Sequence, residues 1–136
     1  MASLAKKILI VEDNKLLQQV YFDILVKEGF LVLQAFTGQQ GLTMATTYKP
    51  DLIILDIMLP GGLNGFDILS QLKANLVFKH TPIVMLTDLK DEKKTAESIG
   101  ASGYIIKNEK NIDETISNIK SYLKTDLFGK IKKILE

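Results

Sequence analysis

The sequence contains no cysteine and no arginine, and it has a single histidine, His80. Without cysteine the chain can form no disulfide, use no thiol in catalysis and offer no thiolate to a metal. One histidine cannot supply a histidine metal cluster. All 17 basic residues are lysine, so the side chain best suited to bidentate recognition of phosphates and bases is missing. Together with a formal net charge of only +1, this argues against direct binding of nucleic acid.

Long hydrophobic runs are also missing. The apolar run in the N-terminal stretch MASLAKKILIVED is too short for the core of a signal peptide, and two acids follow it at once. No run approaches the roughly 18 apolar residues that a membrane span needs. We therefore expect a soluble, cytoplasmic protein that binds no membrane. With 136 residues, 46% hydrophobic and 24% charged, the chain is long enough for one globular domain with a core.

Five short apolar segments alternate with helical patterns along the chain. Most of them are nearly continuous apolar runs, which are typical of strands covered on both faces in a parallel sheet. Five such repeats predict a doubly wound α/β domain with right-handed crossovers. The segments are KILIV (7–11), LVLQAF (31–36), DLIILD (51–56), PIVMLT (82–87) and GYIIK (103–107).

Capping residues mark the predicted helices between these segments. The first helix should end near Gly29, and the second should begin after Thr37 and close before Pro50. We expect a third helix over about 66–76 and a fourth, with little apolar surface, over about 91–99. The fifth should begin after Asn111, where Glu114 stands three residues on, as in a capping box.

The fifth helical pattern continues past the expected end of the domain. Apolar residues recur every three or four positions from Ile112 to Ile134, although Gly129 interrupts them at a cost of about 1 kcal/mol relative to alanine. Two interpretations stay open: the extension docks on its own domain, or it projects and pairs with another chain. We place the domain at 6–124 and a C-terminal helical extension at 125–136.

Polar side chains follow four of the five predicted strands. Glu12 and Asp13 follow the first strand, Asp56 ends the third, Thr87 ends the fourth and Lys107 ends the fifth. In an open parallel sheet, ligands bind at the carboxyl ends of the strands, so we expect these groups to converge on one edge. Oxygen ligands without histidine or cysteine suit a hard cation such as Mg²⁺.

This set of groups predicts a site for a phosphoryl group. A cation, the Lys107 ammonium and the Thr87 hydroxyl would neutralise the phosphoryl oxygens, while Asp56 could act as the nucleophile that forms an aspartyl-phosphate. Each residue taken alone is more often an ordinary loop or strand-end residue. Their joint placement after four strands carries the prediction.

The motifs ILIVEDN, PDLIILDIMLPGGLNGFDIL, TPIVMLT and GASGYIIK resemble the receiver domain of two-component response regulators, over about residues 6–124. The resemblance implies a flavodoxin-like fold with five helices and the strand order 2-1-3-4-5. It also implies a phosphorelay protein that accepts a phosphoryl group and catalyses only its own phosphorylation and dephosphorylation.

Position by position, the resemblance implies that Asp56 is the phosphoacceptor. Asp13 would bind Mg²⁺ directly, together with Asp56 and the backbone carbonyl of Met58, and Glu12 would act through metal-bound water. The resemblance thus assigns four residues to one metal and acceptor site.

The resemblance further implies a switch. Thr87 and Lys107 would contact the phosphoryl group, and Tyr104 would be the aromatic residue whose rotamer follows the threonine. The implied partners are a sensor histidine kinase or a histidine phosphotransfer protein, and a downstream protein that reads the face of the fourth helix, fifth strand and fifth helix. A homodimer through that face or through the C-terminal helix stays open. Since 125–136 encodes no evident output, the chain is expected to be a single-domain regulator, like those of chemotaxis, or part of a longer protein.

Three features depart from the family pattern. Asn108 stands after the lysine where most relatives have proline, Asp88 stands after the threonine where a small residue is usual, and the loop 60–65 is one residue longer. A carboxylate at Asp88 could repel a phosphoryl group. An alternative is therefore a pseudo-receiver that binds partners without phosphorylation.

Two other classes fit the sequence poorly. A flavin carrier on this fold would need a phosphate-binding loop after the first strand, but EDNK (12–15) would repel a phosphate. A metal-dependent phosphohydrolase would need a second acid near the nucleophile, and Ile57 and Met58 provide none.

Overall fold

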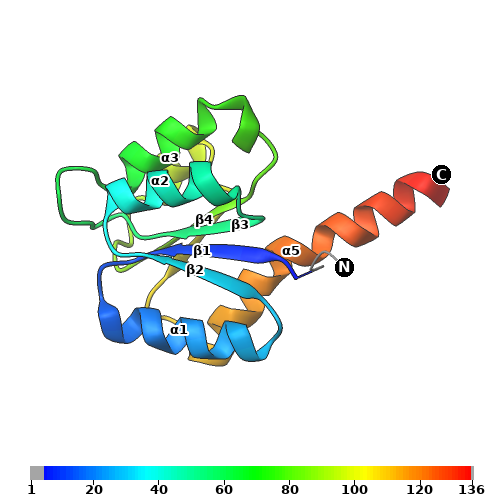
Figure 1. Ribbon diagram of the computed structural model, residues 1–136, viewed down its shortest axis with the longest axis horizontal. Coiled ribbons are helices and arrows are strands. Elements are labelled where there is room, and N and C mark those ends of the chain that lie inside the picture. Colours follow the sequence, from blue (N-terminus) through cyan, green and yellow to red (C-terminus); the bar gives the residue numbers. More distant parts are fainter. Residues whose placement is uncertain (1–4, 136) are drawn as a thin grey trace.

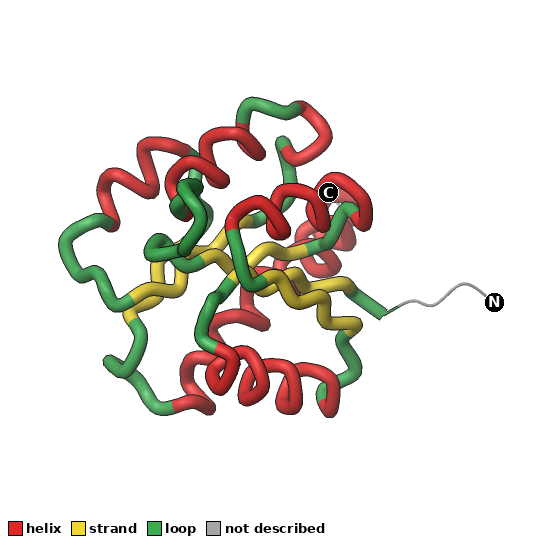
Figure 2. Tube along the Cα trace, turned by 60° about the vertical axis from the view of Figure 1, so that its left-hand side comes forward, coloured by secondary structure: helices red, strands yellow, loops and turns green. Residues whose placement is uncertain are grey.

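The computed structural model of the protein describes residues 5–135, except for the side chains of 124–133 in the last helix. Its centre is a five-stranded parallel sheet in the order β2-β1-β3-β4-β5, which confirms the predicted doubly wound, flavodoxin-like architecture. Figure 2 shows the strands enclosed between helices on two sides. The strands are β1 (Lys7–Val11), β2 (Leu31–Ala35), β3 (Leu52–Leu55), β4 (Ile83–Thr87) and β5 (Gly103–Ile106).

Helices cover both faces of the sheet, and each face has its own hydrophobic core. In Figure 1, α2 and α3 lie above the sheet, while α1 lies below it. Successive residues of β1 alternate between the two cores: Leu9 packs on the α2–α3–α4 side and Ile10 on the α1–α5 side. The continuous apolar runs of the sequence therefore reflect burial on both faces. The helices are α1 (Lys15–Lys27), α2 (Gly38–Tyr48), α3 (Gly65–Lys73), α4 (Lys93–Ile99) and α5 (Ile112–Leu135).

The predicted caps define several helix ends. The Thr37 side chain accepts a hydrogen bond from the Gln40 amide at the start of α2, and Asn111 accepts one from the Glu114 amide at the start of α5. Gly29 follows the end of α1 in the left-handed region, with φ of 97°.

The third helix differs from the expectation at its C-terminal end. It stops at Lys73 rather than near residue 76, and a short 3₁₀ helix, η1 (Leu76–Phe78), follows. The Asn75 side chain accepts a hydrogen bond from the Val77 amide at 3.0 Å, so it begins a new turn instead of continuing α3. The fourth helix is also shorter than expected, and only Ala96 within it is fully buried.

Helix α5 continues without a break to Leu135, and Figure 1 shows its last turns extending beyond the sheet. Near its end, Ile134 and Leu135 are 81% and 80% exposed. Whether the extension docks on its own domain or pairs with another chain depends on side chains of 124–133, which lie outside the described ones, so both interpretations stay open. The side chain at 127 and the effect of Gly129 lie outside the described side chains. Within the described residues, no helix is both long and apolar enough to cross a membrane.

Candidate functional site

Polar groups from four strands meet at the carboxyl edge of the sheet. Because β1, β3, β4 and β5 are neighbours in the sheet, their ends lie side by side. Glu12 and Asp56 are 3% and 5% exposed and Thr87 is fully buried, whereas Asp13 faces solvent. The fold thus brings together groups that stand up to 95 positions apart in the chain, from Glu12 to Lys107.

Three carboxylates form the centre of the site. Glu12, Asp13 and Asp56 each offer an oxygen within 4.8 Å of the others. Backbone amides fix two of them: the Asn14 amide donates to Glu12 Oε2 at 3.0 Å, and the Met58 amide donates to Asp56 Oδ1 at 3.3 Å. So close a cluster of like charges is stabilised by a cation or by protonation of one carboxylate.

Lys107 supplies positive charge inside this cluster. Its Nζ donates to Asp56 Oδ2 at 2.8 Å and forms an ion pair with Glu12 Oε1. Burial disfavours the charged lysine, but hydrogen bonding to Asp56 and Glu12 outweighs it, so the pKa of Lys107 is raised. Burial raises the pKa of Glu12, while the Lys107 ammonium and the Asn14 amide oppose that shift. Lys107 brings one positive charge to a cluster of three carboxylates, so it cannot by itself balance all of them when they are ionised.

The residues fit a divalent cation. All of the donors are oxygens, and solvent-exposed Asp13 leaves room for the waters that Mg²⁺ keeps. Glu12 Oε1 is buried, and its partner is the Lys107 ammonium, with which it forms an ion pair.

Thr87 and Tyr104 are connected through Leu89 in the β4–α4 loop. The Leu89 amide donates to Thr87 Oγ1 at 3.4 Å, and the Tyr104 hydroxyl donates to the Leu89 carbonyl. Burial raises the pKa of Tyr104, so its hydroxyl keeps its proton and can remain a donor. A movement of Thr87 that displaced Leu89 would therefore change the hydrogen bond of the Tyr104 hydroxyl.

Gly65 is a residue of the site that the sequence analysis missed. It begins α3, and its amide donates to the Ile57 carbonyl at 2.8 Å. A Cβ at this position would lie 2.2 Å from the Asp56 carbonyl oxygen and 2.7 Å from the Ile57 Cα. The sequence offered one indication of this role: a glycine stands directly after Asn64. Asn64 is the N-cap of α3 and takes part in a capping box.

The residues that depart from the family pattern line one side of the site. Asp88 and Asn108 border a pocket of about 310 Å³ that also contains Lys107. Asp88 is exposed, and Asn108 has φ of 64°, in the left-handed region that asparagine tolerates. All peptide bonds in the described residues are trans, including the bond between Lys107 and Asn108.

A doubly wound sheet with an acidic cluster and a lysine at its carboxyl edge defines a class of signalling domain. The family model described as "Response regulator receiver domain" matches residues 8–120, and the chain belongs to that family. It is therefore a receiver domain of two-component phosphorelay signalling, a class of module that interacts with histidine kinases and with downstream targets.

Similar proteins agree with this assignment. The chain is 31% identical to the polar-differentiation response regulator DivK of Brucella anthropi over 120 residues, covering 87% of this chain and 96% of that protein. The chemotaxis response regulator CheY4 of Vibrio cholerae is similar with a TM-score of 0.80 and 27% identity, over 87% of this chain and 98% of that one.

A second similar structure holds a metal. The receiver domain of a sensor histidine kinase from Pseudomonas aeruginosa has a magnesium ion coordinated in its active-site cleft. Its TM-score is 0.77 with 25% identity, over 88% of this chain and 98% of that one. Receiver domains bind Mg²⁺ at an acidic pocket, and in this chain the acidic cluster of Glu12, Asp13 and Asp56 is the corresponding feature.

Proposed function

We propose that the chain is a phosphorylation switch in which Asp56 accepts a phosphoryl group from a histidine kinase or a histidine phosphotransfer protein. One observation carries the proposal: Asp56 lies in a cluster of three carboxylates, and Lys107 Nζ donates to its Oδ2 at 2.8 Å. Asp13, Asp56 and the Met58 carbonyl would hold Mg²⁺, with Glu12 acting through water. When bound, the ion supplies charge neutralisation for the phosphoryl oxygens.

The chemistry is a transfer between two nucleophiles. A carboxylate oxygen of Asp56 attacks phosphorus, the new O–P bond forms, and the N–P bond of the donor phosphohistidine breaks so that imidazole leaves. Lys107 donates to a phosphoryl oxygen as charge develops there, and the Thr87 hydroxyl can donate to another. A pseudo-receiver would lack this reaction even though the same groups are present.

The proposed response spreads from Thr87 to the face of α4, β5 and α5. Phosphorylation adds about 1.5 to 2 negative charges at Asp56, which would draw the Thr87 hydroxyl toward it. Because Leu89 contacts both Thr87 and Tyr104, Tyr104 would then lose or change its hydrogen bond. We expect a downstream protein in the cytoplasm to read this change.

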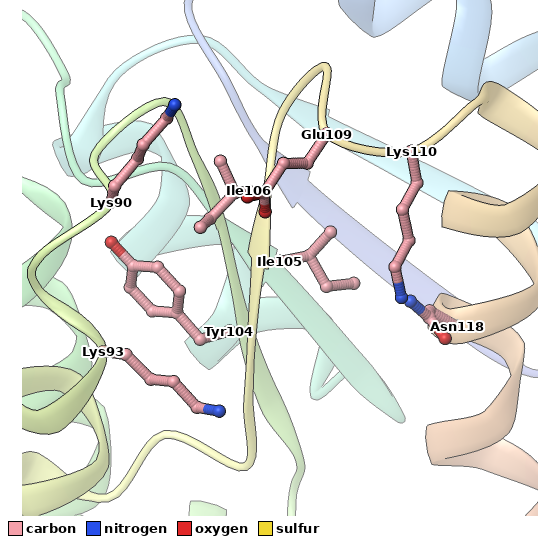
Figure 3. A pocket seen from close by; sticks show the side chains of 8 residues that line it. All are labelled: Lys90, Lys93, Tyr104, Ile105, Ile106, Glu109, Lys110 and Asn118. Atoms are coloured by element: carbon pink, nitrogen blue, oxygen red, sulfur yellow. The ribbon is translucent and has the colours of Figure 1, made fainter.

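The pocket that would change lies on that face. Its volume is about 230 Å³, and Figure 3 shows the Tyr104 ring between the side chains of Lys90 and Lys93 at one side. A new Tyr104 rotamer would therefore reshape the surface offered to a partner, which is how a local charge change biases binding. The lining residues are Lys90, Lys93, Tyr104, Ile105, Ile106, Glu109, Lys110 and Asn118.

Intact mass spectrometry tests the proposed acceptor. After incubation with acetyl phosphate and Mg²⁺, the native chain should gain the mass of one phosphoryl group, and Asp56→Asn should gain none. Asp91→Asn, which removes an exposed carboxylate of the β4–α4 loop, should behave like the native chain. Equal labelling of the native chain and Asp56→Asn would place the phosphoryl group elsewhere and refute the proposal.

The pseudo-receiver is the second candidate, and the exposed Asp88 carboxylate beside Lys107 favours it. In that case the native chain would gain no phosphoryl group. It would also show no change in its amide NMR spectrum on addition of beryllofluoride with Mg²⁺. A spectral change that spreads to Thr87 and Tyr104 would reject the pseudo-receiver.

Asp88→Ala should accelerate phosphorylation by acetyl phosphate. The substitution removes a negative charge from the rim of the pocket that contains Lys107, where an anionic donor must approach. We expect an increase of about two- to fivefold at low salt that shrinks as salt is added, because salt screens exposed charges. Asp91→Ala removes the same charge from the same loop and should leave the rate near its native value. Equal rates for the native chain and Asp88→Ala at low salt would contradict the prediction.

A further inference from the structure

Gln18 is a buried polar side chain to which the proposed phosphorylation chemistry gives no role. It lies near the start of α1 and is only 1% exposed. Its Nε2 donates to three backbone carbonyls: Ile10 at 3.1 Å, Glu12 at 3.1 Å and Ala35 at 2.8 Å. Its Oε1 accepts from Gln34 Nε2 at 3.3 Å. The amide group has two hydrogens for three carbonyls, so one hydrogen is shared, and the whole side chain serves as a tether.

The three carbonyls lie where the hydrogen-bond ladder between β1 and β2 ends. The Glu12 amide donates to the Ala35 carbonyl at 3.0 Å, directly after Val11 and Ala35, the last paired residues of the two strands. Beyond it the chain turns away, and the Phe36 amide donates at 2.8 Å to the side chain of Gln40 in α2. The Glu12 carbonyl lies past the paired residues of β1 and β2, and it accepts from the Gln18 side chain where a backbone amide of β2 would donate if the ladder continued.

The tether acts on the segment that carries two of the three carboxylates. Glu12 and Asp13 directly follow β1, outside the regular ladder, and their oxygens come within 4.8 Å of one from Asp56. Mutual repulsion pushes such carboxylates apart when no metal ion is bound. The Lys107 ammonium opposes this movement through the side chains of Glu12 and Asp56, and contacts to the backbone oppose it at the main chain. Asn14 helps from one side, because its amide holds Glu12 Oε2. Gln18 holds the main chain of Glu12 itself.

We propose that Gln18 is a positioning residue for the divalent-cation site, acting through the main chain of Glu12 to hold Glu12 and Asp13 close to Asp56. The inference rests on the proposed function, since it concerns the same site. If the tether is removed, the carboxylates separate, and a cation must bring them together again before it can bind. The affinity for the cation then falls, because supporting contacts of this kind tune how well ligand groups are oriented.

A Mg²⁺ titration followed by amide NMR shifts tests this role. Gln18→Met keeps the length of the side chain but removes every N–H donor. We expect its Mg²⁺ dissociation constant to rise about tenfold, the lower end of what loss of a supporting contact costs a metal site. Gln19→Met is the matched control, because Gln19 is exposed and its side chain donates to Asp23 on the same helix. Its dissociation constant should match the native value.

Phosphorylation kinetics separate positioning from a purely structural role. In Gln18→Met, the Mg²⁺ concentration for half-maximal rate should rise about tenfold, as the affinity falls, while the rate at saturating Mg²⁺ stays near native. A residue that only stabilises the fold would lower the melting temperature in EDTA and leave the Mg²⁺ dissociation constant unchanged. That result in folded Gln18→Met would overturn the inference.

Two further outcomes are decisive. If circular dichroism shows that Gln18→Met does not fold, Gln18→Asn replaces it, because its amide is one methylene too short to reach all three carbonyls. A native dissociation constant in Gln18→Asn would then overturn the inference, and a raised one supports it. The native chain is titrated first. If it does not bind Mg²⁺, that result refutes the proposed function and not only the role of Gln18.

Discussion

Lys107→Met is expected to lower the free energy of unfolding by about 3 kcal/mol in EDTA near pH 7, which is the scale for breaking a buried ion pair from one side. The Lys107 side chain is 11% exposed and contacts both Glu12 and Asp56. Without its ammonium, three clustered carboxylates keep no internal cation. Urea denaturation monitored by circular dichroism measures the loss.

Mg²⁺ should restore much of that stability. A cation bound by the carboxylates replaces the missing positive charge, and a ligand that binds only the folded state stabilises it by mass action. The stabilisation by saturating Mg²⁺ should therefore be larger in Lys107→Met than in the native chain. Lys110→Met, at an exposed lysine of the following loop, should unfold like the native chain in both buffers. Equal Mg²⁺ responses of the native chain and Lys107→Met would show that the lysine and the cation do not balance the same charges.

Gly65→Ala is the second substitution with a large expected effect. The new methyl group would lie 2.2 Å from the Asp56 carbonyl oxygen, and this atom belongs to the backbone and cannot rotate away. Either α3 or the end of β3 must shift, so we expect a loss of about 2–3 kcal/mol in the free energy of unfolding. Urea denaturation checks this value.

The same shift should reach the phosphoacceptor. Because the clash falls on the backbone of Asp56 itself, Gly65→Ala should also slow phosphorylation by acetyl phosphate by at least about tenfold, as misplacing a reacting group by 1 Å can cost a hundredfold. Ser70→Ala, an exposed site on the same helix, is the control and should retain native stability and rate. Native behaviour of Gly65→Ala in both assays would show that α3 moves away from Asp56 without consequence.

Much of the fold could be predicted because its signals are local. Apolar runs identified all five strands, since strands buried on both faces keep apolar side chains at consecutive positions. Thr37 and Asn111 marked helix starts because a capping side chain bonds to an amide only three residues away. The end of α3 was misplaced because Asn75 could equally continue a helix or begin a new turn, and the sequence does not show which.

Two residues of the site escaped the sequence analysis for a different reason. Gln18 belongs to the buried stripe of α1 with Tyr21 and Leu25, and a polar residue on such a stripe was the available signal. Its acceptors, however, include the carbonyl of Ala35, 17 positions away on another strand. Gly65 resembles an ordinary loop glycine until the Asp56 carbonyl is placed beside it.

The sequence by itself determined the alternation of strands and helices, the starts of α2 and α5 and the chemical types at the strand ends. These depend on burial patterns and on hydrogen bonds between residues three or four apart, so short windows contain them. Only the tertiary structure decided that Lys107 contacts both Glu12 and Asp56, and that Gln18 and Gly65 hold the backbone around them. Those contacts depend on the order of the strands and on the way each helix crosses back over the sheet. The physical reason is that distances between remote segments are fixed by the packing of whole layers and not by any local pattern.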